Sequence, residues 1–387
     1  MTTTAPAPMV FDVTVLNSIE AAEEAWRELE AVGTLTPYQR FDWLKLLLDA
    51  GAEPNSRIAI AVVSLAEEIV ALLPLAIHQR LGLRTARLLG TDYSNVDWML
   101  ATPDFAANAT QLRAIVADIA RQVGGIDILS LQNLPANWNG MANLLLQLPH
   151  MIGPSNFYFT SLANVPKPFI STRLAPKRRG DLQRSRRRME EALGTVELVR
   201  VQDAATLEHV HERFLEQRRE RFDEMGVDNV FEEPVFRAFF HEAALAGFGQ
   251  ERPPLLVHSL MANGVVTATS WGTTAGDHYS LYINSTESGD ASRFSLMSIL
   301  IADLMDDLID MGITSFDIGL GDFHYKARWT EPQPVYNSLL PLTAAGRLAA
   351  LALTGRSELK RTIKQNPKLW QAASGVRRVL HHLRPGK

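Results

Sequence analysis

The sequence predicts an α/β protein of two similar domains, each built on a sheet that mixes parallel and antiparallel strands. Its 387 residues are a usual length for two or three domains. Hydrophobic residues make up 46% of the chain and charged residues 21%, so each domain has enough apolar side chains to bury a core. The two halves also repeat one order of elements: strand, helix, helix, three strands, helix, strand. This repeat of architecture predicts two copies of one fold.

The first half begins with alternating apolar and polar residues over 10–16, which predict a strand. Ser18 is placed to cap a helix that carries Trp26 and Leu29 at helical spacing. The remaining predicted elements are a helix over 38–48, a hairpin of strands over 57–65 and 69–79, a strand within 87–100, a helix over 112–123 and a buried strand over 126–131.

The second half repeats this order with a different sequence. Asn263 and Gly264 lie between two β-rich segments and predict the tight turn of a hairpin. Gly312 ends the long helix that follows the third strand of this group. The predicted elements are a strand over 196–201, helices over 206–223 and 234–246, strands over 255–262, 265–274 and 277–283, a helix over 296–311 and a strand over 315–318.

The domain boundary is expected near residues 164–168, where two prolines flank Lys167. This placement gives an N-terminal domain over 1–165 and a C-terminal domain over 166–345. The last segment, 346–387, has helical patterning and many basic residues, and few signs of a core of its own.

The composition excludes several classes of protein and site. The chain has no cysteine, so disulfides and thiolate metal sites are ruled out, and His381-His382 lacks the further ligands that a metal site needs. The net charge is −5, which does not suit a chain that binds DNA or membranes as a whole. No apolar run reaches the roughly 18 residues of a transmembrane helix, and residues 1–8 lack the pattern of a secretion signal. We therefore expect a soluble, cytoplasmic protein without a metal cofactor.

Two segments of the second half contain recognisable sequence motifs. Residues 179–184 are Arg-Gly-Asp-Leu-Gln-Arg, and residues 317–322 are Asp-Ile-Gly-Leu-Gly-Asp, followed by Tyr325, Lys326 and Trp329. These two motifs resemble those of the cellulose-biosynthesis-type (CelD/BcsL) acetyltransferases of the GNAT class, which carry Asp-Phe/Leu-x-x-Gly-Asp-x-x-Tyr-Lys-x-x-Trp after the last core strand. The tandem arrangement is similar to that of the Fem-type aminoacyltransferases. The resemblance implies two GNAT-like domains, a catalytic C-terminal domain, and acetyl-CoA or another acyl-CoA as the donor.

The loop before the helix over 296–311 is the expected donor site. A helix N-terminus has free N–H groups and a positive dipole end, and GNAT enzymes bind the pyrophosphate of coenzyme A there. The usual Gln/Arg-x-x-Gly-x-Gly/Ala loop is absent, so the alternative is an ordinary loop in which Ser292 or Ser295 caps the helix. The predicted donor residues are Gly289, Ser292, Arg293, Phe294, Ser295 and Leu296.

Four polar residues lie in or after the strand over 315–318, at the sheet edge where α/β proteins bind ligands. An acyltransferase needs a base for the attacking group and a positive or hydrogen-bonding group near the thioester oxygen. Asp322 or His324 is the predicted base, and Lys326 is predicted to stabilise the oxyanion or bind an anionic substrate. The alternative is structural, with Asp322 in a turn, Lys326 solvated, and Tyr325 and Trp329 in the core. Asp322 and Lys326 are four residues apart, so a helical turn would put them on one side and allow an ion pair. The predicted catalytic residues are Asp317, Asp322, His324 and Lys326.

Two basic segments are candidates for binding the acceptor or the donor. Arg218 and Arg221 share one face of a predicted helix, and together with Tyr325 and Trp329 they are the predicted substrate residues. Charge that complements the helix dipole is the alternative for this pair. Residues 173–188 are strongly basic, so they either form a solvated helix face or attract coenzyme A phosphates, an anionic glycan or transfer RNA.

The predicted function is the transfer of an acyl group, expected to be acetyl, from acyl-CoA to an amine or hydroxyl of a small-molecule or glycan acceptor. The resemblance implies a role in polysaccharide or cell-envelope metabolism. The N-terminal domain lacks a glycine-bearing phosphate loop, so its expected role is structural or acceptor-binding. Two alternatives remain: a Fem-like enzyme that uses aminoacyl-tRNA, and a non-catalytic pair of degenerate GNAT domains.

Overall fold

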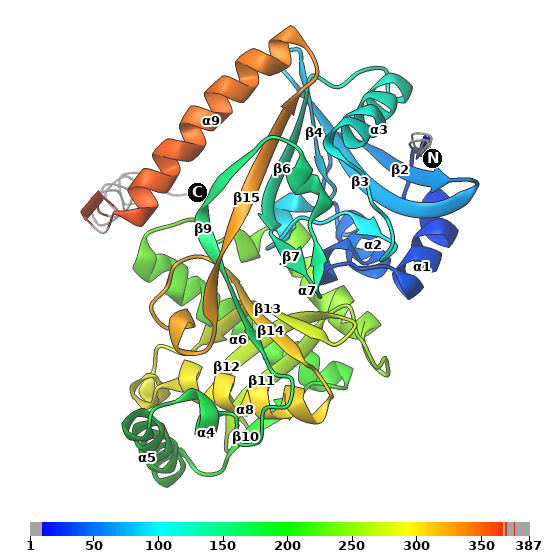
Figure 1. Ribbon diagram of the computed structural model, residues 1–387. Helices are drawn as coiled ribbons and strands as arrows, with labels where there is room; N and C mark the ends of the chain where they lie inside the picture. Colours follow the sequence, from blue (N-terminus) through cyan, green and yellow to red (C-terminus); the bar gives the residue numbers. More distant parts are fainter. Residues whose placement is uncertain (1–9, 367, 370–374, 376–387) are drawn as a thin grey trace, which may run out of the picture. The chain divides into compact units, whose positions relative to one another are not determined.

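The computed structural model describes residues 10–366, 368, 369 and 375 (Figure 1). These residues form two compact units. Unit 1 contains the described residues up to 45, together with 53–153 and 334–359. Unit 2 contains 46–52, 154–333 and the described residues from 360 onward. His381 and His382 lie outside the described residues.

Unit 1 is built on a mixed sheet in the order β1-β2-β3-β4-β6-β15. Strands β4 and β6 are parallel, and the other neighbours in this order are antiparallel. The strands are β1 (Asp12–Leu16), β2 (Ser56–Leu65), β3 (Glu68–Arg80), β4 (Leu83–Leu88), β6 (Ile128–Pro135) and β15 (Glu331–Pro341), with the short β5 (Leu100–Ala101) beside β3 and a separate β7–β8 pair (Asn137–Trp138 and Met141–Ala142). The helices in this part of the chain are α1 (Glu23–Val32), α2 (Phe41–Asp49), α3 (Ala109–Gln122) and, later, α9 (Ala344–Gln365).

Local signals explain why α3 forms where it does. The side chain of Asn108 accepts hydrogen bonds from the N–H groups of Thr110 and Gln111, and the Gln111 side chain accepts one from the Asn108 N–H, which makes a complete capping box. Ile115 and Ile119 then lie at helical spacing and join the core of unit 1. The predicted helix over 112–123 is confirmed, but the strand predicted within 87–100 lies earlier, at β4.

Unit 2 has a mixed sheet in the order β10-β11-β12-β13-β14-β9, in which β13 and β14 are parallel. Asn263 and Gly264 both have positive φ, 48° and 78°, as the predicted hairpin turn between β11 and β12 requires. The strands are β9 (His150–Ser161), β10 (Val196–Arg200), β11 (Leu256–Ala262), β12 (Val265–Ala275), β13 (His278–Thr286) and β14 (Ser315–Leu320). The helices are α4 (Ile170–Arg173), α5 (Pro176–Leu193), α6 (Ala204–Met225), α7 (Pro234–Ala246) and α8 (Leu296–Asp310).

Helices cover both faces of the unit 2 sheet. On one face, Phe214 of α6 and Phe240 of α7 pack their rings against Trp271 of β12. On the other face, α8 and α5 share a core with Tyr279 of β13 and Leu260 of β11.

Each unit takes its last strand from the other half of the sequence. β9 follows the elements of the first half, but its Phe157–Ser161 stretch pairs antiparallel with β14 of unit 2. β15 follows the elements of the second half, but it pairs antiparallel with β6 of unit 1. The units are therefore interleaved along the chain, whereas the predicted ranges 1–165 and 166–345 are consecutive. Among the described residues, no helix is both long and apolar enough to cross a membrane.

Candidate active site

The N-terminal end of α8 is free of any side-chain cap. Ser295 precedes the helix in the left-handed region, with φ 49° and ψ 39°, and its hydroxyl makes no capping hydrogen bond. Ser292 lies one turn earlier, inside the short helix η6 (Asp290–Phe294). Ser295 thus occupies the N-cap position, as one of the two alternatives expected, but its side chain does not cap the helix, and Ser292 is not the N-cap residue. The first N–H groups of α8, at the positive end of its dipole, remain available to an anion.

A pocket of about 240 Å³ adjoins this helix end. It is lined by side chains from three elements: α8, α5 and the short helix η7 (Lys326–Arg328) with the residue after it. Arg178 and Arg328 form no ion pair with any carboxylate in the part of the chain that the structure describes. The residues that give the pocket its character are Arg178, Asp181, Ser295, Ser298, Arg328 and Trp329. Two unpaired guanidinium groups and a free helix N-terminus suit a pyrophosphate.

The predicted donor residues divide into two groups. Ser295 lines the pocket, and Leu296 is the first residue of α8. Phe294 is buried in the core, where the guanidinium of Arg293 lies 4.8 Å from its ring centroid. Gly289, Ser292 and Arg293 are exposed and are not among the residues that line the pocket.

The sequence did not single out three of the lining residues. Ser298 lies one turn after Ser295 on α8, and Arg328 lies inside the Tyr-Lys-x-x-Trp block. Arg178 lies in the basic run that was noted only as a whole. Their signal was weak because nothing in the sequence places α5 beside the start of α8.

Strands β13 and β14 separate soon after they begin. They pair over only three residue pairs, from His278↔Ser315 to Ser280↔Asp317, and then diverge while β13 continues to Thr286. We call the region bordered by the later residues of the two strands the strand splay: 281–286 of β13 and 318–320 of β14. Ligands in α/β sheets bind beyond the carboxyl ends of parallel strands, so the splay is a natural place for a reacting group.

Asp317 holds the paired part of these strands together. Its Oδ2 lies 2.7 Å from Nε2 of His278, and its Oδ1 accepts a hydrogen bond from the N–H of Gly319. The other ring nitrogen of His278 lies 2.8 Å from the hydroxyl of Ser315. Asp317 and His278 are both fully buried, so the carboxylate of this predicted catalytic residue contacts groups of β13 and β14 and is closed to solvent.

Asp322 and His324 lie on the exposed segment that leaves β14. Oδ1 of Asp322 accepts hydrogen bonds from the Asn156 side chain at 2.8 Å and from the Tyr158 hydroxyl at 3.1 Å. The side chain of Gln365 donates to Oδ2 at 3.2 Å. The carboxylate is thus held in one orientation and remains accessible.

Lys326 is buried, with only 4% of its surface exposed. Its ammonium donates a hydrogen bond to the carbonyl oxygen of Leu320 at 2.6 Å and lies 5.7 Å from the ring centroid of Tyr158. Burial lowers the pKa of Lys326 to about 8, although the nearby Asp317 and Asp322 raise it. The alternative of a solvated lysine is therefore wrong.

The ion pair expected from the spacing of Asp322 and Lys326 does not form in the described structure. Gly319 and Gly321 have φ values of 64° and 107°, so the chain turns there and becomes helical only at Lys326. A spacing of four residues brings side chains together only on a continuous helix.

Arg218 and Tyr325, two predicted substrate residues, meet at Asn284 of β13. Nη1 of Arg218 donates to the Asn284 carbonyl oxygen at 3.3 Å, and the Tyr325 hydroxyl is hydrogen-bonded to the Asn284 side chain. Burial lowers the pKa of Arg218 to about 10 and raises the pKa of Tyr325. Arg221 instead is exposed and pairs with Glu224 at 3.0 Å, and Trp329 is buried at the pocket described above.

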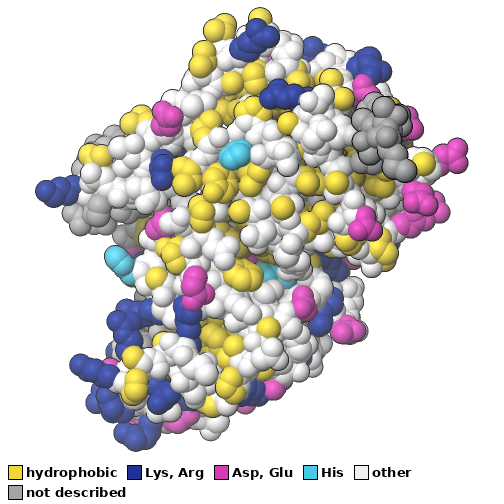
Figure 2. Space-filling view, viewed as in Figure 1, with side chains coloured by type: hydrophobic (Ala, Val, Ile, Leu, Met, Phe, Trp, Pro, Cys, Tyr) yellow, Lys and Arg dark blue, Asp and Glu magenta, His cyan; other side chains and the backbone are white. Residues whose placement is uncertain are grey.

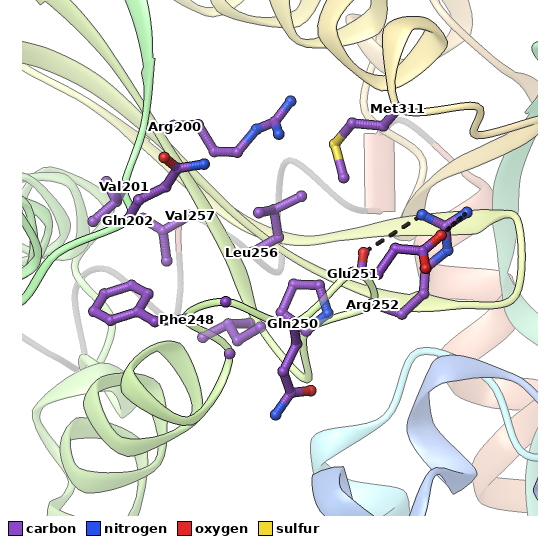
Figure 3. A pocket seen from close by; sticks show the side chains of 14 residues that line it. Arg200, Val201, Gln202, Phe248, Gln250, Glu251, Arg252, Leu256, Val257 and Met311 are labelled. Atoms are coloured by element: carbon purple, nitrogen blue, oxygen red, sulfur yellow. Dashed lines mark hydrogen bonds and ion pairs between the residues drawn. The ribbon is translucent and has the colours of Figure 1, made fainter.

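A second pocket, also of about 240 Å³, lies beside β10, β11 and the loop over 247–255 (Figure 3). Its arginines already have partners. Nη2 of Arg200 donates to both carboxylate oxygens of Asp307 at 2.8 Å, and Arg252 pairs with Glu251. Because its cations are neutralised, this pocket suits an anionic ligand less well than the pocket at α8.

Comparison with known protein families matches a segment of unit 2. The family model of the acetyltransferase (GNAT) domain matches residues 176–327, a range that includes α5, α8, the strand splay and Lys326. A search by sequence finds no match among curated proteins.

Several solved structures are similar in fold. FemX has a TM-score of 0.56 at 10% identity, over 84% of this chain and 97% of its own. The C-terminal domain of a putative lysylphosphatidylglycerol synthetase from Agrobacterium fabrum has a TM-score of 0.52 at 12% identity, over 87% of this chain and 97% of its own. L-PGS from Bacillus licheniformis has a TM-score of 0.51 at 12% identity, over 86% of this chain and 95% of its own. These identities show the fold alone. The chain thus has a mixed α/β fold similar to the folds of these structures, and the greater part of unit 2 matches the GNAT acetyltransferase domain.

Proposed function

We propose that unit 2 transfers an acyl group from acyl-CoA to an amine or hydroxyl acceptor. The observation that carries the proposal is the pocket at the start of α8, which combines an uncapped helix N-terminus with the unpaired Arg178 and Arg328. A pyrophosphate needs N–H donors and cations at this kind of position. The match of residues 176–327 to a GNAT acetyltransferase domain supports the same donor.

The reaction forms a bond between the acceptor nitrogen or oxygen and the thioester carbon, and it breaks the carbon–sulfur bond. Coenzyme A leaves as the thiol, and the proton lost by the acceptor balances the thiol that is formed. Negative charge builds on the carbonyl oxygen before the carbon–sulfur bond breaks. Lys326 supplies positive charge at low dielectric, where such stabilisation is strong, and Asp322 takes the proton of the acceptor.

The acyl group and the acceptor follow from the resemblance to the CelD-type acetyltransferases alone. On that ground, acetyl is the proposed acyl group. A sugar of a polysaccharide or a cell-envelope precursor is the proposed class of acceptor.

A second candidate donor, aminoacyl-tRNA, is favoured by the exposed cations of α5. Figure 2 shows Lys and Arg side chains gathered over this helix. The exposed members are Lys177, Arg178, Arg184, Arg187 and Arg188. Such a helix attracts polyanions. However, Arg184 pairs with Asp181, and Arg187 pairs with Glu191, so part of this charge is neutralised. Acyl-CoA is therefore the preferred donor.

The two donors are separated by a product assay. We expect thiol release from acetyl-CoA to depend on an added acceptor, tested with amino sugars, amino acids and polyamines. The Lys326→Met variant should reduce that release by about 10²–10³-fold, the usual loss when one oxyanion-stabilising group is removed. Transfer from charged transfer RNA, with no acceptor-dependent thiol release, would instead favour the second candidate.

A further inference from the structure

Arg218 is a partly buried cation that no carboxylate of the described residues neutralises. Its Nε is fully buried and has no hydrogen-bond partner. In the described chain its guanidinium forms no ion pair, and its hydrogen bond is the 3.3 Å contact from Nη1 to the carbonyl oxygen of Asn284. The rings of Phe222 and Phe231 lie 4.7 and 5.1 Å from its Cζ. The guanidinium is thus fixed against two aromatic faces and one carbonyl.

This arrangement is unlike that of the other arginines on α6. Arg213 pairs with Glu216, Arg219 with Glu232 and Arg221 with Glu224. Arg219 and Arg221 are exposed to water, where an ion pair adds little stability. Arg218 is the one that most needs a counter-ion, because burying an unpaired charge is costly, and it is the one that lacks a carboxylate. Contacts with ring faces offset only part of that cost.

The unpartnered edge of Arg218 has a defined chemistry. Nε and Nη2 form the side of the guanidinium from which two parallel N–H groups donate, and neither makes a hydrogen bond within the described residues. Two parallel donors match the two oxygens of a carboxylate. The group opposite this edge in a ligand is therefore expected to be planar and anionic.

The position of Arg218 connects it with the proposed reaction. Asn284 belongs to β13 after that strand has left β14, so Arg218 is anchored to the strand splay. Tyr325, which bonds the same asparagine, directly precedes Lys326. A ligand group on Arg218 therefore lies on the same part of unit 2 as the proposed oxyanion-stabilising lysine.

We propose that Arg218 binds a carboxylate of the acceptor, so that the acceptor is an amino acid, a hydroxy acid or an acidic sugar rather than a neutral amine or alcohol. The assignment of that carboxylate to the acceptor rests on the proposed acyltransferase function. The binding of a carboxylate at Arg218 does not, and it is tested without any donor.

The test measures thermal unfolding of the full chain in sodium acetate, sodium succinate and sodium phosphate, each against sodium chloride at equal ionic strength. Binding to the folded state alone raises the melting temperature as the ligand concentration passes its Kd. We expect acetate and succinate to give a saturable rise in the parent protein that Arg218→Met loses. Arg213→Met, which removes a paired arginine of the same helix, should keep the rise and so controls for general anion effects.

Three results would overturn the proposal. One is a carboxylate response in Arg218→Met equal to that of the parent. Another is the absence of any saturable carboxylate response in the parent. The third is a response to phosphate alone that Arg218→Met loses, which would assign a phosphate to this edge. If Arg218→Met does not fold, Arg218→Lys provides the same test, because it keeps the charge but loses the two parallel donors.

A second measurement applies once transfer is observed. Amino acids should be better acceptors than their own amides by about 10- to 100-fold, the usual effect of hydrogen bonds to a charged group. Arg218→Met should remove that preference, while Arg213→Met should not. Absence of acetyl-CoA binding would disprove the proposed function and leave the melting test of Arg218 intact, so the two failures are distinguishable.

Discussion

At the scale of single residues, Lys326 lies in an environment far from the ordinary one of a lysine side chain. It is buried beside the rings of Tyr158 and Phe323, and it donates to the carbonyl of Leu320. Burial disfavours the charged form, which places the pKa of Lys326 at about 8 instead of 10.5. A lysine whose pKa is lowered so far is unusual outside functional sites, and the lowered pKa supports the proposed role of Lys326 in the reaction.

The depressed pKa of Lys326 predicts how stability changes with pH. Between about pH 8 and 10.5 the unfolded chain holds a proton that the folded protein has released, so raising the pH stabilises the folded state. The effect of this one group approaches about 1.4 kcal/mol per pH unit. Urea unfolding of the parent and of Lys326→Met should show a difference in unfolding free energy that grows in favour of the parent across this window. Parallel curves would contradict the assignment.

Asp322 is predicted to affect turnover more than stability. Asp322→Asn keeps the shape of the side chain and removes its basicity, so turnover per folded molecule should fall by about 10²–10⁴-fold if it takes the acceptor's proton. The carboxylate of Asp322 is exposed at the surface, where its hydrogen bonds with Asn156 and Tyr158 contribute little stability, so the melting temperature of Asp322→Asn should change little. Melting and turnover are measured on the same preparation, and a lower melting temperature with unchanged turnover would give Asp322 a structural role.

At the scale of elements, the pocket depends on where α5 and η7 meet the start of α8. Arg178 comes from α5, Arg328 from η7 and Ser298 from α8, and Ser295 directly precedes α8. None of these elements forms an anion site by itself. Their meeting brings two unpaired cations to the positive end of a helix.

This geometry predicts which arginines affect coenzyme A binding. Arg178→Glu and Arg328→Glu each place a carboxylate in the pocket and should weaken coenzyme A binding by about tenfold or more, with most of the effect lost at high salt. Arg293→Glu should also weaken binding, but less, because Arg293 lies against Phe294 outside the lining. Equal affinities for the parent and Arg328→Glu, measured by fluorescence titration, would exclude this pocket as the pyrophosphate site.

The elements that the sequence predicts well are those with local signals. The turn at Asn263-Gly264 and the helix over 234–246 are confirmed, because a positive-φ pair and a proline at the helix start act within a few residues. β9 and β15 were missed. Pro154 interrupts β9 and two prolines interrupt β15, so neither shows a clean strand pattern.

The residues of the proposed site were also predictable only where the signal is local in sequence. Ser295, Arg218 and Tyr325, which belong to the proposed site, were singled out from the sequence because their position in the order of elements is informative. The proximity of Arg178 and Arg328 was not predicted, because the two residues are far apart in sequence and only tertiary packing brings them together. The predicted ion pair of Asp322 with Lys326 does not form, because the prediction assumed a helix at a place where two glycines turn the chain.

At the scale of the whole molecule, the exchange of β9 and β15 defines what each unit needs in order to fold. Unit 2 pairs β14 with the end of β9, and unit 1 pairs β6 with β15. A fragment cut at the sequence boundary would lose a strand and expose a sheet edge. The repeat is therefore one of architecture, completed by strands from opposite halves of the chain.

Fragments of the chain test this exchange. Residues 154–333 retain the part of β9 that pairs with β14, whereas residues 166–345 do not. We expect the first fragment to have the higher melting temperature and to protect the amides of β14 from hydrogen exchange, while the second aggregates or exchanges rapidly. Equal stability of the two fragments would show that β9 contributes little to unit 2.

The central claim is that unit 2 binds acyl-CoA at the start of α8. Isothermal titration calorimetry of the full chain with acetyl-CoA tests it most directly, with the double variant Arg178→Glu, Arg328→Glu as the control. The account predicts saturable binding at about one molecule per chain in the parent, from the single pocket assigned to the pyrophosphate, and loss of that binding in the double variant. No heat of binding in the parent, or equal binding in both proteins, would contradict it.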